Sequence, residues 1–582
     1  MTLRTFSMTG VQVDLSSHFT DPDGIEASAL SKAAVREAAR AYILDEIASS
    51  EAVTRLWKRR LNALTVVARL PPELLGTIFK YVAGTETPEY ATVRWIAVSH
   101  VCWHWRRVAL DCPDLWSNIR FGHPSLAAEM VQRSRMAPLT VFATLGDGYG
   151  KRVARQSEGL AVQAVLRQIL SQMSRVKELS LKTSASWASD MLTELIALMD
   201  GPAPLLENLS ISCLGRDDAN RLSDSLVAGL PRLVHLDLSG CGMTWHGVVL
   251  RNLTSLKISN IPRTMYPSVH QLLTALSQMP SLEVLQFHSD FSPADAAHIP
   301  RETAVHLPCL HSFDIQCELS DCAALLDHVT YSKKARVLIN CQNTHPNPAN
   351  DVLLIHNLAE KLARGMEGQI KLLRLASRSV KCWRSIRTST ANRRAIPPTL
   401  SVSFSLELVG EFVKSLPLDD LVSLMVVGDQ LDSAMWTKLG NINRLTRLEI
   451  GWGENDVAVL NTLSHGIPRG GEESTTSGQP GPTPTPQLKA LRSLMITGWM
   501  FDADFEDSSM TVAEKLSDCL EARSEAGLKL RFLEIKGCRH VTDEDIECLE
   551  ASVERLSWDG ERNFTDEETD AYSVTYSDVE VL

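Results

Sequence analysis

Short segments with one fixed spacing of apolar residues recur through most of the chain. Each reads apolar-x-x-apolar-x-apolar, as in "LVHLDL" at Leu233 and "LTRLEI" at Leu445. The segments begin at Val176, Leu206, Leu233, Leu253, Leu282, Leu310, Ile370, Leu421, Leu445, Leu491, Leu530 and Val553, with weaker candidates near Val337 and at Ser401. The alternation that closes each segment predicts a short β-strand with one buried face.

Amphipathic helical stretches separate many of these predicted strands. Examples are "MLTELIALMDG", "SVHQLLTALSQMP", "LLIHNLAEKLARGMEG" and "TVAEKLSDCLEARSEAG" at residues 191–201, 268–280, 353–368 and 511–527. A strand plus a helix roughly every 20–30 residues predicts an α/β solenoid. A doubly wound α/β enzyme also alternates strands and helices, but its strands read as continuous Val/Ile runs.

Residues 171–558 resemble the leucine-rich repeat family, in an irregular form. "LDLSGCGMT" at Leu236 and "LEIKGCRHVTDEDI" at Leu533 are similar to its cysteine-containing subtype. The resemblance implies that Cys241 and Cys538 close the turn after their strands. Cys213, Asn260 and Cys317 fall one residue early, and several repeats lack such a residue, so we expect irregular curvature.

The N-terminal part is divided differently. Residues 1–24 are polar and unpatterned, which predicts disorder. Residues 25–65 predict a helical segment, with apolar positions that include Ile43, Ile47, Trp57 and Leu61. Its imperfect heptad favours packing against the next domain, and a coiled-coil dimer is the alternative.

Two apolar helical segments follow, "LPPELLGTIFKYV" at residues 70–82 and "VSHVCWHWRRVAL" at 98–110. The prolines are typical of a helix start. One apolar face is predicted on each helix, from Leu74, Leu75, Ile78, Phe79 and Val82, and from Trp95, Val98, Cys102 and Trp105. A self-contained helical domain explains part of this pattern. A unit of about fifty residues buries only about 60% of its surface, however, so apolar area remains for a partner.

These segments, with "PDLWSNI" after them, resemble an F-box of the form common in fungal proteins, within a domain at residues 66–120. The resemblance implies docking on the Skp-family adaptor of a cullin–RING ubiquitin ligase. The implied docking residues are Leu70, Pro71, Leu74, Leu75, Ile78, Phe79, Val98, Cys102 and Trp105. The insert "AGTETPEYATVRW" departs from compact members of the family.

Composition excludes several other classes. The 582 residues carry 58 basic and 70 acidic side chains, a net charge of −12, which argues against a nucleic-acid partner. No run of about 18 apolar residues predicts a membrane span. The twelve cysteines lack zinc-type pairs, and Cys309, His311, Cys317 and Cys322 are the nearest to a ligand group. We expect buried free thiols, no metal or cofactor, and residence in the cytoplasm and/or nucleus.

No catalytic motif is present. "GDGYGK" at Gly146 lacks the glycine and the Ser/Thr that a P-loop requires, and neither HExxH nor GxSxG occurs. A basic stretch at residues 371–394 predicts a helix face that carries Arg374, Arg378, Lys381 and Arg384. It is either a solvated face or a site for an acidic or phosphorylated substrate.

The remaining segments complete the predicted organisation. Residues 121–170 are a connecting segment, 468–487 a Pro/Gly/Ser/Thr-rich disordered insert, and 559–582 an acidic tail. The sequence therefore predicts a non-enzymatic adaptor that delivers a protein substrate to an SCF-type ligase. The alternative is a repeat scaffold that does not join a ligase.

Overall fold

The computed structural model describes residues 6–8, 11–13, 33–84, 94–121, 123–146, 152–184, 188–215, 217–247, 249–292, 303–342, 348–385, 397–428, 431–451, 456–467, 485–505 and 510–560. The chain splits into two compact units. Unit 1 holds Met1–Asn118 and Glu129–Ala137, and unit 2 holds Ile119–Ala128 and Pro138–Leu582.

Unit 1 is mainly helical where it is described. Its elements are β1 (Phe6–Met8), β2 (Val11–Val13), α1 (Ala33–Ala63), the 3-10 helix η2 (Val66–Arg69), α2 (Pro72–Gly84), η3 (Arg94–His100), α3 (Trp103–Leu110) and η4 (Pro113–Trp116). Strands β1 and β2 pair antiparallel within the segment predicted to be disordered, and the rest of residues 1–24 lies outside the described residues. Helix α1 falls within the predicted helical segment.

Unit 2 is built around one mixed sheet. In spatial order its strands are β4 (Leu139–Leu145), β5 (Val176–Thr183), β6 (Asn208–Ser212), β7 (His235–Ser239), β8 (Ser255–Ser259), β9 (Val284–His288), β11 (Ser312–Glu318), β13 (Arg336–Gln342), β16 (Leu400–Ser403), β15 (Ser379–Trp383), β14 (Leu372–Ala376), β17 (Ser423–Val427), β18 (Arg447–Gly451), β19 (Ser493–Thr497), β20 (Phe532–Lys536) and β21 (Leu556–Trp558). All neighbours are parallel except β14–β15 and β15–β16. The pairings run in a single line, so the sheet is open.

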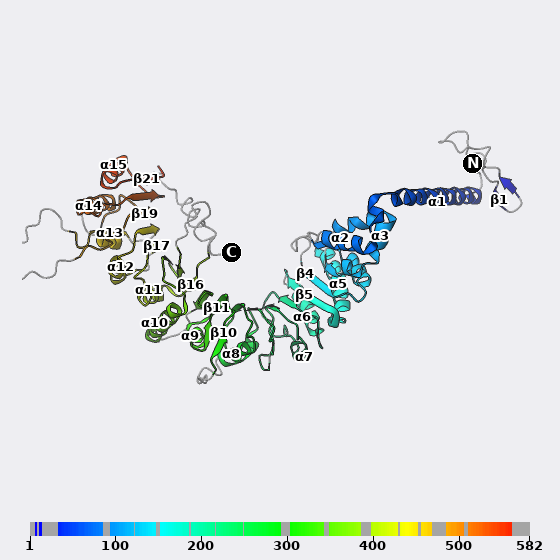
Figure 1. Ribbon diagram of the computed structural model, residues 1–582, viewed down its shortest axis with the longest axis horizontal. Coiled ribbons are helices and arrows are strands. Elements are labelled where there is room, and N and C mark those ends of the chain that lie inside the picture. The colour runs from blue at the N-terminus through cyan, green and yellow to red at the C-terminus, as the bar shows by residue number, and fades with distance from the viewer. Residues whose placement is uncertain are drawn as a thin grey trace, which may run out of the picture. The chain divides into compact units, whose positions relative to one another are not determined.

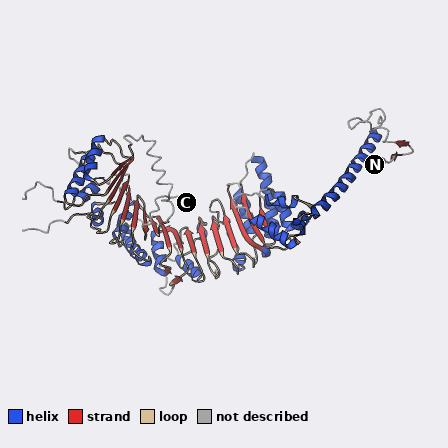
Figure 2. Ribbon diagram, turned by 45° about the horizontal axis from the view of Figure 1, so that its top comes forward, coloured by secondary structure: helices blue, strands red, loops and turns tan. Residues whose placement is uncertain are grey.

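Helices lie along one face of this sheet (Figures 1 and 2). They are α5 (Arg152–Leu170), α6 (Ser189–Ala197), α7 (Asp224–Ala228), α8 (Val269–Ser277), α9 (Leu319–His328), α10 (Pro348–Gly365), α11 (Leu406–Lys414), α12 (Ser433–Gly440), α13 (Asp456–Ser464), α14 (Val512–Glu525) and α15 (Asp543–Ser552). Helix α4 (Pro124–Arg133) has residues in both units. Strand β3 (Asn118–Arg120), strands β10 (Val305–Leu307) and β12 (Val329–Tyr331), and the 3-10 helices η5 (Met173–Arg175) and η7 (Arg263–Met265) complete the fold.

The period-two pattern explains the strands. In β6 the side chains of Leu209 and Ile211 are buried, and Ser210 between them is half-buried on the other face. All twelve predicted segments overlap strands of this sheet, and the two weaker candidates form β13 and β16. Because parallel neighbours align in register, their apolar positions form continuous rows in the core.

The turn cysteines are buried thiols. Cys241 and Cys538 have no exposed surface, and neither forms a disulfide. The Cys538 thiol lies 3.5 Å from the Lys536 carbonyl oxygen. Burial raises the pKa of the Cys538 thiol to about 12, so this sulfur stays protonated at neutral pH.

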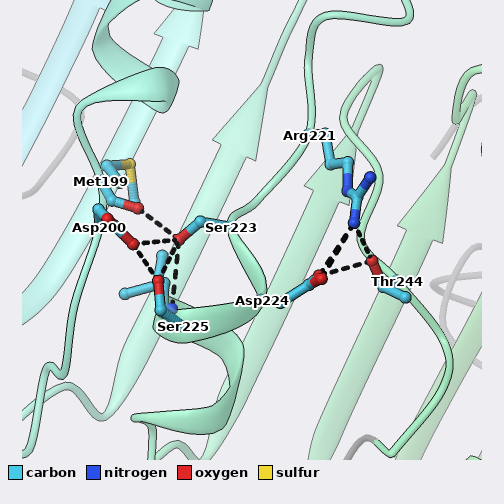
Figure 3. A network of polar contacts seen from close by, with 8 residues as sticks. Met199, Asp200, Arg221, Ser223, Asp224, Ser225 and Thr244 are labelled. Carbon is cyan, nitrogen blue, oxygen red and sulfur yellow. Dashed lines mark hydrogen bonds and ion pairs between the residues drawn. The ribbon is translucent and has the colours of Figure 1, made fainter.

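Polar contacts tie successive strand–helix segments together near α7 (Figure 3). The Ser223 hydroxyl donates to the Met199 carbonyl at 2.9 Å and also contacts the Asp200 carboxylate at 3.2 Å. Asp200 accepts a further hydrogen bond from Ser225. These bonds, with Ser225 contributing most, lower the pKa of the Asp200 carboxyl.

A second cluster joins the start of α7 to the next loop. The Thr244 hydroxyl donates to Asp224 at 2.6 Å, and the Arg221 guanidinium donates to the same carboxylate at 3.1 Å (Figure 3). Thr244 first and Arg221 second lower the pKa of Asp224. Hydrogen bonds to Asp224 thus connect the loop that holds Arg221 with the loop that holds Thr244.

Two predicted segments have structured parts. The connecting segment 121–170 contains α4, β4 and α5, and β4 pairs in parallel with β5, so the sheet begins before residue 171. At the end of the 468–487 insert, the Gln487 side chain is buried. Residues 468–484 of the insert and residues 561–582 of the tail lie outside the described residues.

Candidate protein-interaction site

Helix α2 packs one side into the interior of unit 1. Leu75 and Phe79 have no exposed surface. The Phe79 ring lies 5.1 Å from the ring of Trp105 in α3, at an interplanar angle of 51°. These contacts fix the rotation of α2, because aromatic pairs add to the stabilisation that burial provides.

A second aromatic pair anchors the helices that follow. The rings of Trp95 and Trp116 lie 5.1 Å apart, edge to face. The Trp116 indole N–H donates to the Ala109 carbonyl at 2.7 Å, and the Arg133 guanidinium lies 4.4 Å from the Trp116 ring centroid. The polar atom of this buried indole therefore has an acceptor, and the pair holds η3 against η4.

The adjoining side of α2 presents apolar side chains to solvent. Leu74 is 53% exposed, Ile78 44%, Tyr81 78% and Val82 42%. Their spacing places them along one strip of the helix. We call these four residues the α2 outer face. Adjacent exposed apolar side chains on a folded surface are typical of a protein-binding site.

The predicted docking residues are thus divided between the interior and the surface. Leu74, Ile78 and Pro71 are exposed, Leu70, Cys102 and Trp105 are half-buried, and Leu75, Phe79 and Val98 are buried. The five residues predicted to share one face of α2 span about 140° of the helix, and part of that band is buried while the rest faces solvent. Pro71 and Cys102 help to begin helices: the Pro71 carbonyl accepts from Leu74 N–H at 3.1 Å, and the Cys102 sulfur accepts from Trp105 N–H at 3.5 Å.

Some exposed apolar residues of this domain were not predicted as docking residues. Tyr81 and Val82 belong to the α2 outer face, and Val101 and Trp103 are 60% and 48% exposed at the start of α3. The seven-residue spacing from Leu74 to Tyr81 is a signal that could have identified the tyrosine. For Trp103 the sequence offers no such signal. Trp103 and Trp105 are both tryptophans two residues apart, and only the structure shows that Trp105 packs on Phe79 while Trp103 is exposed.

The basic stretch does not form the predicted helix. Strands β14 and β15 make an antiparallel hairpin in which Arg374 and Lys381 are direct cross-strand partners. Arg378 is exposed at the turn. Arg384 is set apart: its guanidinium donates to the Lys333 carbonyl at 2.8 Å, and burial lowers its pKa. Arg387, Arg393 and Arg394 lie outside the described residues.

The sheet face that the helices leave uncovered has a depression over β5 to β9, lined by both polar and apolar residues. Its volume is about 530 Å³, and its lining includes Ser180, Ser210, Asp237 and Lys257. Burial raises the pKa of Asp237, and the nearby Lys257 charge opposes this shift. The lining therefore offers hydroxyl groups and both signs of charge together with apolar surface from Phe142 and Val284.

Two other kinds of feature are absent from the described ranges. No group of three or more His, Cys, Asp or Glu side chains there could hold a metal ion. Among the same residues, no helix is long and apolar enough to cross a membrane.

Comparison with protein-family models matches residues 67–122 to the F-box-like family. The match includes η3, η4 and α3, together with all of α2 and its outer face. No curated protein matches the chain. The chain therefore contains an F-box-like domain in the part of the sequence that resembles an F-box.

Proposed function

We propose that this chain, which contains an F-box-like domain, is a substrate-recognition adaptor of an SCF-type ubiquitin ligase. The observation that carries the proposal is the α2 outer face within residues 67–122. F-box domains generally bind Skp-family adaptors, and a helix with exposed Leu, Ile, Tyr and Val side chains can supply such a contact.

The geometry supports this role through two sides of one helix. Leu75 and Phe79 hold α2 in the domain, so Leu74 and Ile78 are presented without further folding. A preorganised surface loses less conformational entropy on binding than a mobile one. Val101 and Trp103 supply additional apolar surface in the same domain.

Co-purification of the full chain with a Skp-family adaptor and a cullin tests this proposal. We expect a stable complex of the three proteins, with no catalytic activity in the chain by itself. A full-length, folded chain that captures neither protein would contradict the adaptor role and would favour the scaffold that does not join a ligase.

For the substrate, we infer a role for the uncovered sheet face of unit 2. We propose that its strand–helix segments are leucine-rich repeats forming a solenoid, and that this face receives a protein in the cytoplasm and/or nucleus. Arg374 and Lys381 lie side by side on it, and Arg378 extends the positive charge at the turn. Such a group favours an acidic or phosphorylated segment.

Charge reversal tests the substrate surface. Arg378→Glu with Lys381→Glu should reduce the labelling of neighbouring proteins in cells by a proximity-labelling fusion, while adaptor binding persists. Arg232→Glu with Arg251→Glu is the matched control, because it changes the net charge equally at exposed sites elsewhere in unit 2. If both double variants gave identical labelling, the basic residues of the hairpin would be a solvated face and not a substrate site.

A further inference from the structure

Helix α1 carries an apolar stripe that its own unit does not cover. Ile43, Ile47, Trp57 and Leu61 follow a four–three spacing in which Ser50 and Thr54 occupy the two middle positions. Ile47 is 49% exposed, Trp57 61% and Leu61 67%, whereas Ile43 is half-buried. At 100° per residue these positions form one narrow band, which is the seam of a two-helix coiled coil. We call them the α1 stripe.

The contact between α1 and the domain leaves this stripe accessible. The Arg59 guanidinium lies 4.8 Å from the Trp103 ring centroid, which joins α1 to α3. Arg59 points away from the stripe. It lies twelve residues after Ile47, which is three full turns of the helix plus about 120°. The Arg60 guanidinium lies 4.8 Å from the Trp57 ring and covers part of it.

Charge is segregated along the same helix. Residues 43–51 contain Asp45, Glu46 and Glu51 and no basic residue. Residues 52–61 contain four basic residues and no acidic one: Arg55, Lys58, Arg59 and Arg60. A partner that complements α1 must therefore be basic at one end and acidic at the other. An α1 helix from a second chain, turned end for end, has this property.

We propose that α1 pairs antiparallel with α1 of a second copy of the chain, centred between Ser50 and Thr54. Ile47 is then level with the partner's Trp57, and Ile43 with the partner's Leu61. Glu46 and Arg60 lie on the same flank of the stripe, so Glu46 meets the partner's Arg60. Parallel pairing places acidic halves together and basic halves together, and such flanking charges set the orientation of coiled coils.

The first test is the mass of the full chain in solution by light scattering after size exclusion. We expect twice the 64.3 kDa of one chain. Ile47→Glu with Leu61→Glu should return the mass to that of one chain. Leu56→Glu is the matched control, since Leu56 is 46% exposed on the opposite side of the same helix, and it should leave the mass doubled.

The second test is orientation by cysteine cross-linking. The starting chain carries Cys309→Ser and Cys548→Ser, because these two cysteines are the exposed ones. A mixture of Ile47→Cys chains and Trp57→Cys chains should form a mixed disulfide-linked dimer. Each variant alone should not, since antiparallel pairing separates Ile47 from the partner's Ile47 by about ten residues, or about 15 Å along the axis.

Three results would overturn the proposal. They are a single-chain mass for the wild type at micromolar concentrations, a doubled mass for the stripe variant, and self-cross-linking of either cysteine variant. Circular dichroism of each variant shows whether its helix content is retained. Adaptor binding is measured separately, so a failure of this proposal is distinct from a failure of the proposed function.

Discussion

Arg523, in α14, is fully buried and joins three backbone carbonyls. Its guanidinium donates to Leu463 at 3.0 Å, to Gln487 at 3.2 Å and to Leu488 at 2.8 Å. Burial lowers the pKa of this group to about 10, so it remains charged at neutral pH. Leu463 precedes the insert, and Gln487 and Leu488 lie at its C-terminal end, so one side chain holds both ends of the insert.

We expect Arg523→Met to lower the free energy of unfolding by about 3 kcal/mol, because three buried carbonyls each lose a partner at about 1 kcal/mol. Denaturant unfolding of the full chain measures this change. Arg251→Met, at an exposed position, should leave the free energy within about 0.5 kcal/mol of the wild type. Equal effects of the two substitutions would contradict the structural role of Arg523.

Asp200 should make stability depend on pH in an identifiable way. Its folded-state pKa is lowered below 3.8 by the hydroxyls of Ser225 and Ser223 and the Gly201 N–H. The contribution to stability is therefore present above the usual pKa and is lost as pH falls through the folded-state value. The melting-temperature difference between wild type and Asp200→Asn should be largest near neutral pH and should vanish in acid.

The exposed residue Asp190 provides the control for this experiment, because it lies outside the network around Ser223. Asp190→Asn should give a smaller melting-temperature difference at neutral pH than Asp200→Asn gives. A pH-independent difference for Asp200→Asn would show that the network does not depend on the carboxylate charge.

Side-chain direction limits how much of the site the sequence can predict. The apolar residues from Leu74 to Val82 identify α2 as amphipathic. They form a broad band, however, and the sequence does not show which part of the band is buried in the domain. Only the packing of Phe79 against Trp105 shows that Leu75 and Phe79 face inward. The docking role of each residue stays a prediction.

Strands were more predictable than hairpins at the scale of single elements. Each apolar-x-x-apolar-x-apolar segment signals its own strand, because the alternation lies within a few residues. The spacing of Arg374, Arg378, Lys381 and Arg384 is typical of a helix, yet the segment forms β14 and β15. The apolar residues between the charges, such as Leu375 and Val380, are buried in the sheet, so tertiary packing overrides the helical pattern.

Two deletions of different length test which residues of the insert contribute to stability. Replacing residues 468–484 with two glycines should change the free energy of unfolding by less than about 1 kcal/mol, since loop entropy varies slowly with length. The ends are close enough to be joined, because the Gly466 backbone lies against Thr485. Extending the deletion through Gln487 should cost about 2 kcal/mol more, because a buried polar side chain and an Arg523 acceptor are lost.

Thermal and denaturant unfolding of both deletion variants measure this difference. If the shorter deletion proved as destabilising as the longer one, residues 468–484 would belong to the folded structure. If neither deletion destabilised the chain, the contact between Arg523 and Gln487 would carry no stability.

For the whole molecule, the sequence indicated two kinds of organisation, and the structure has two compact units. The helical unit holds the α2 outer face, and the sheet of unit 2 begins at β4, earlier than residue 171. Strand β4 was missed because "LTVFATL" at residues 139–145 lacks the repeated apolar spacing and alternates only weakly in polarity. Its place in the sheet depends on pairing with β5, which a local pattern cannot show.

The central claim is that the α2 outer face binds a Skp-family adaptor, and calorimetric titration of the purified full chain with that adaptor tests it most directly. We predict that Leu74→Glu with Ile78→Glu weakens binding at least about 100-fold, or about 2.7 kcal/mol, as expected when two apolar residues at an interface centre become charged. Leu353→Glu, a matched change at a 64% exposed leucine of α10 in unit 2, should leave affinity unchanged. Wild-type affinity in a folded Leu74→Glu, Ile78→Glu variant would contradict the account.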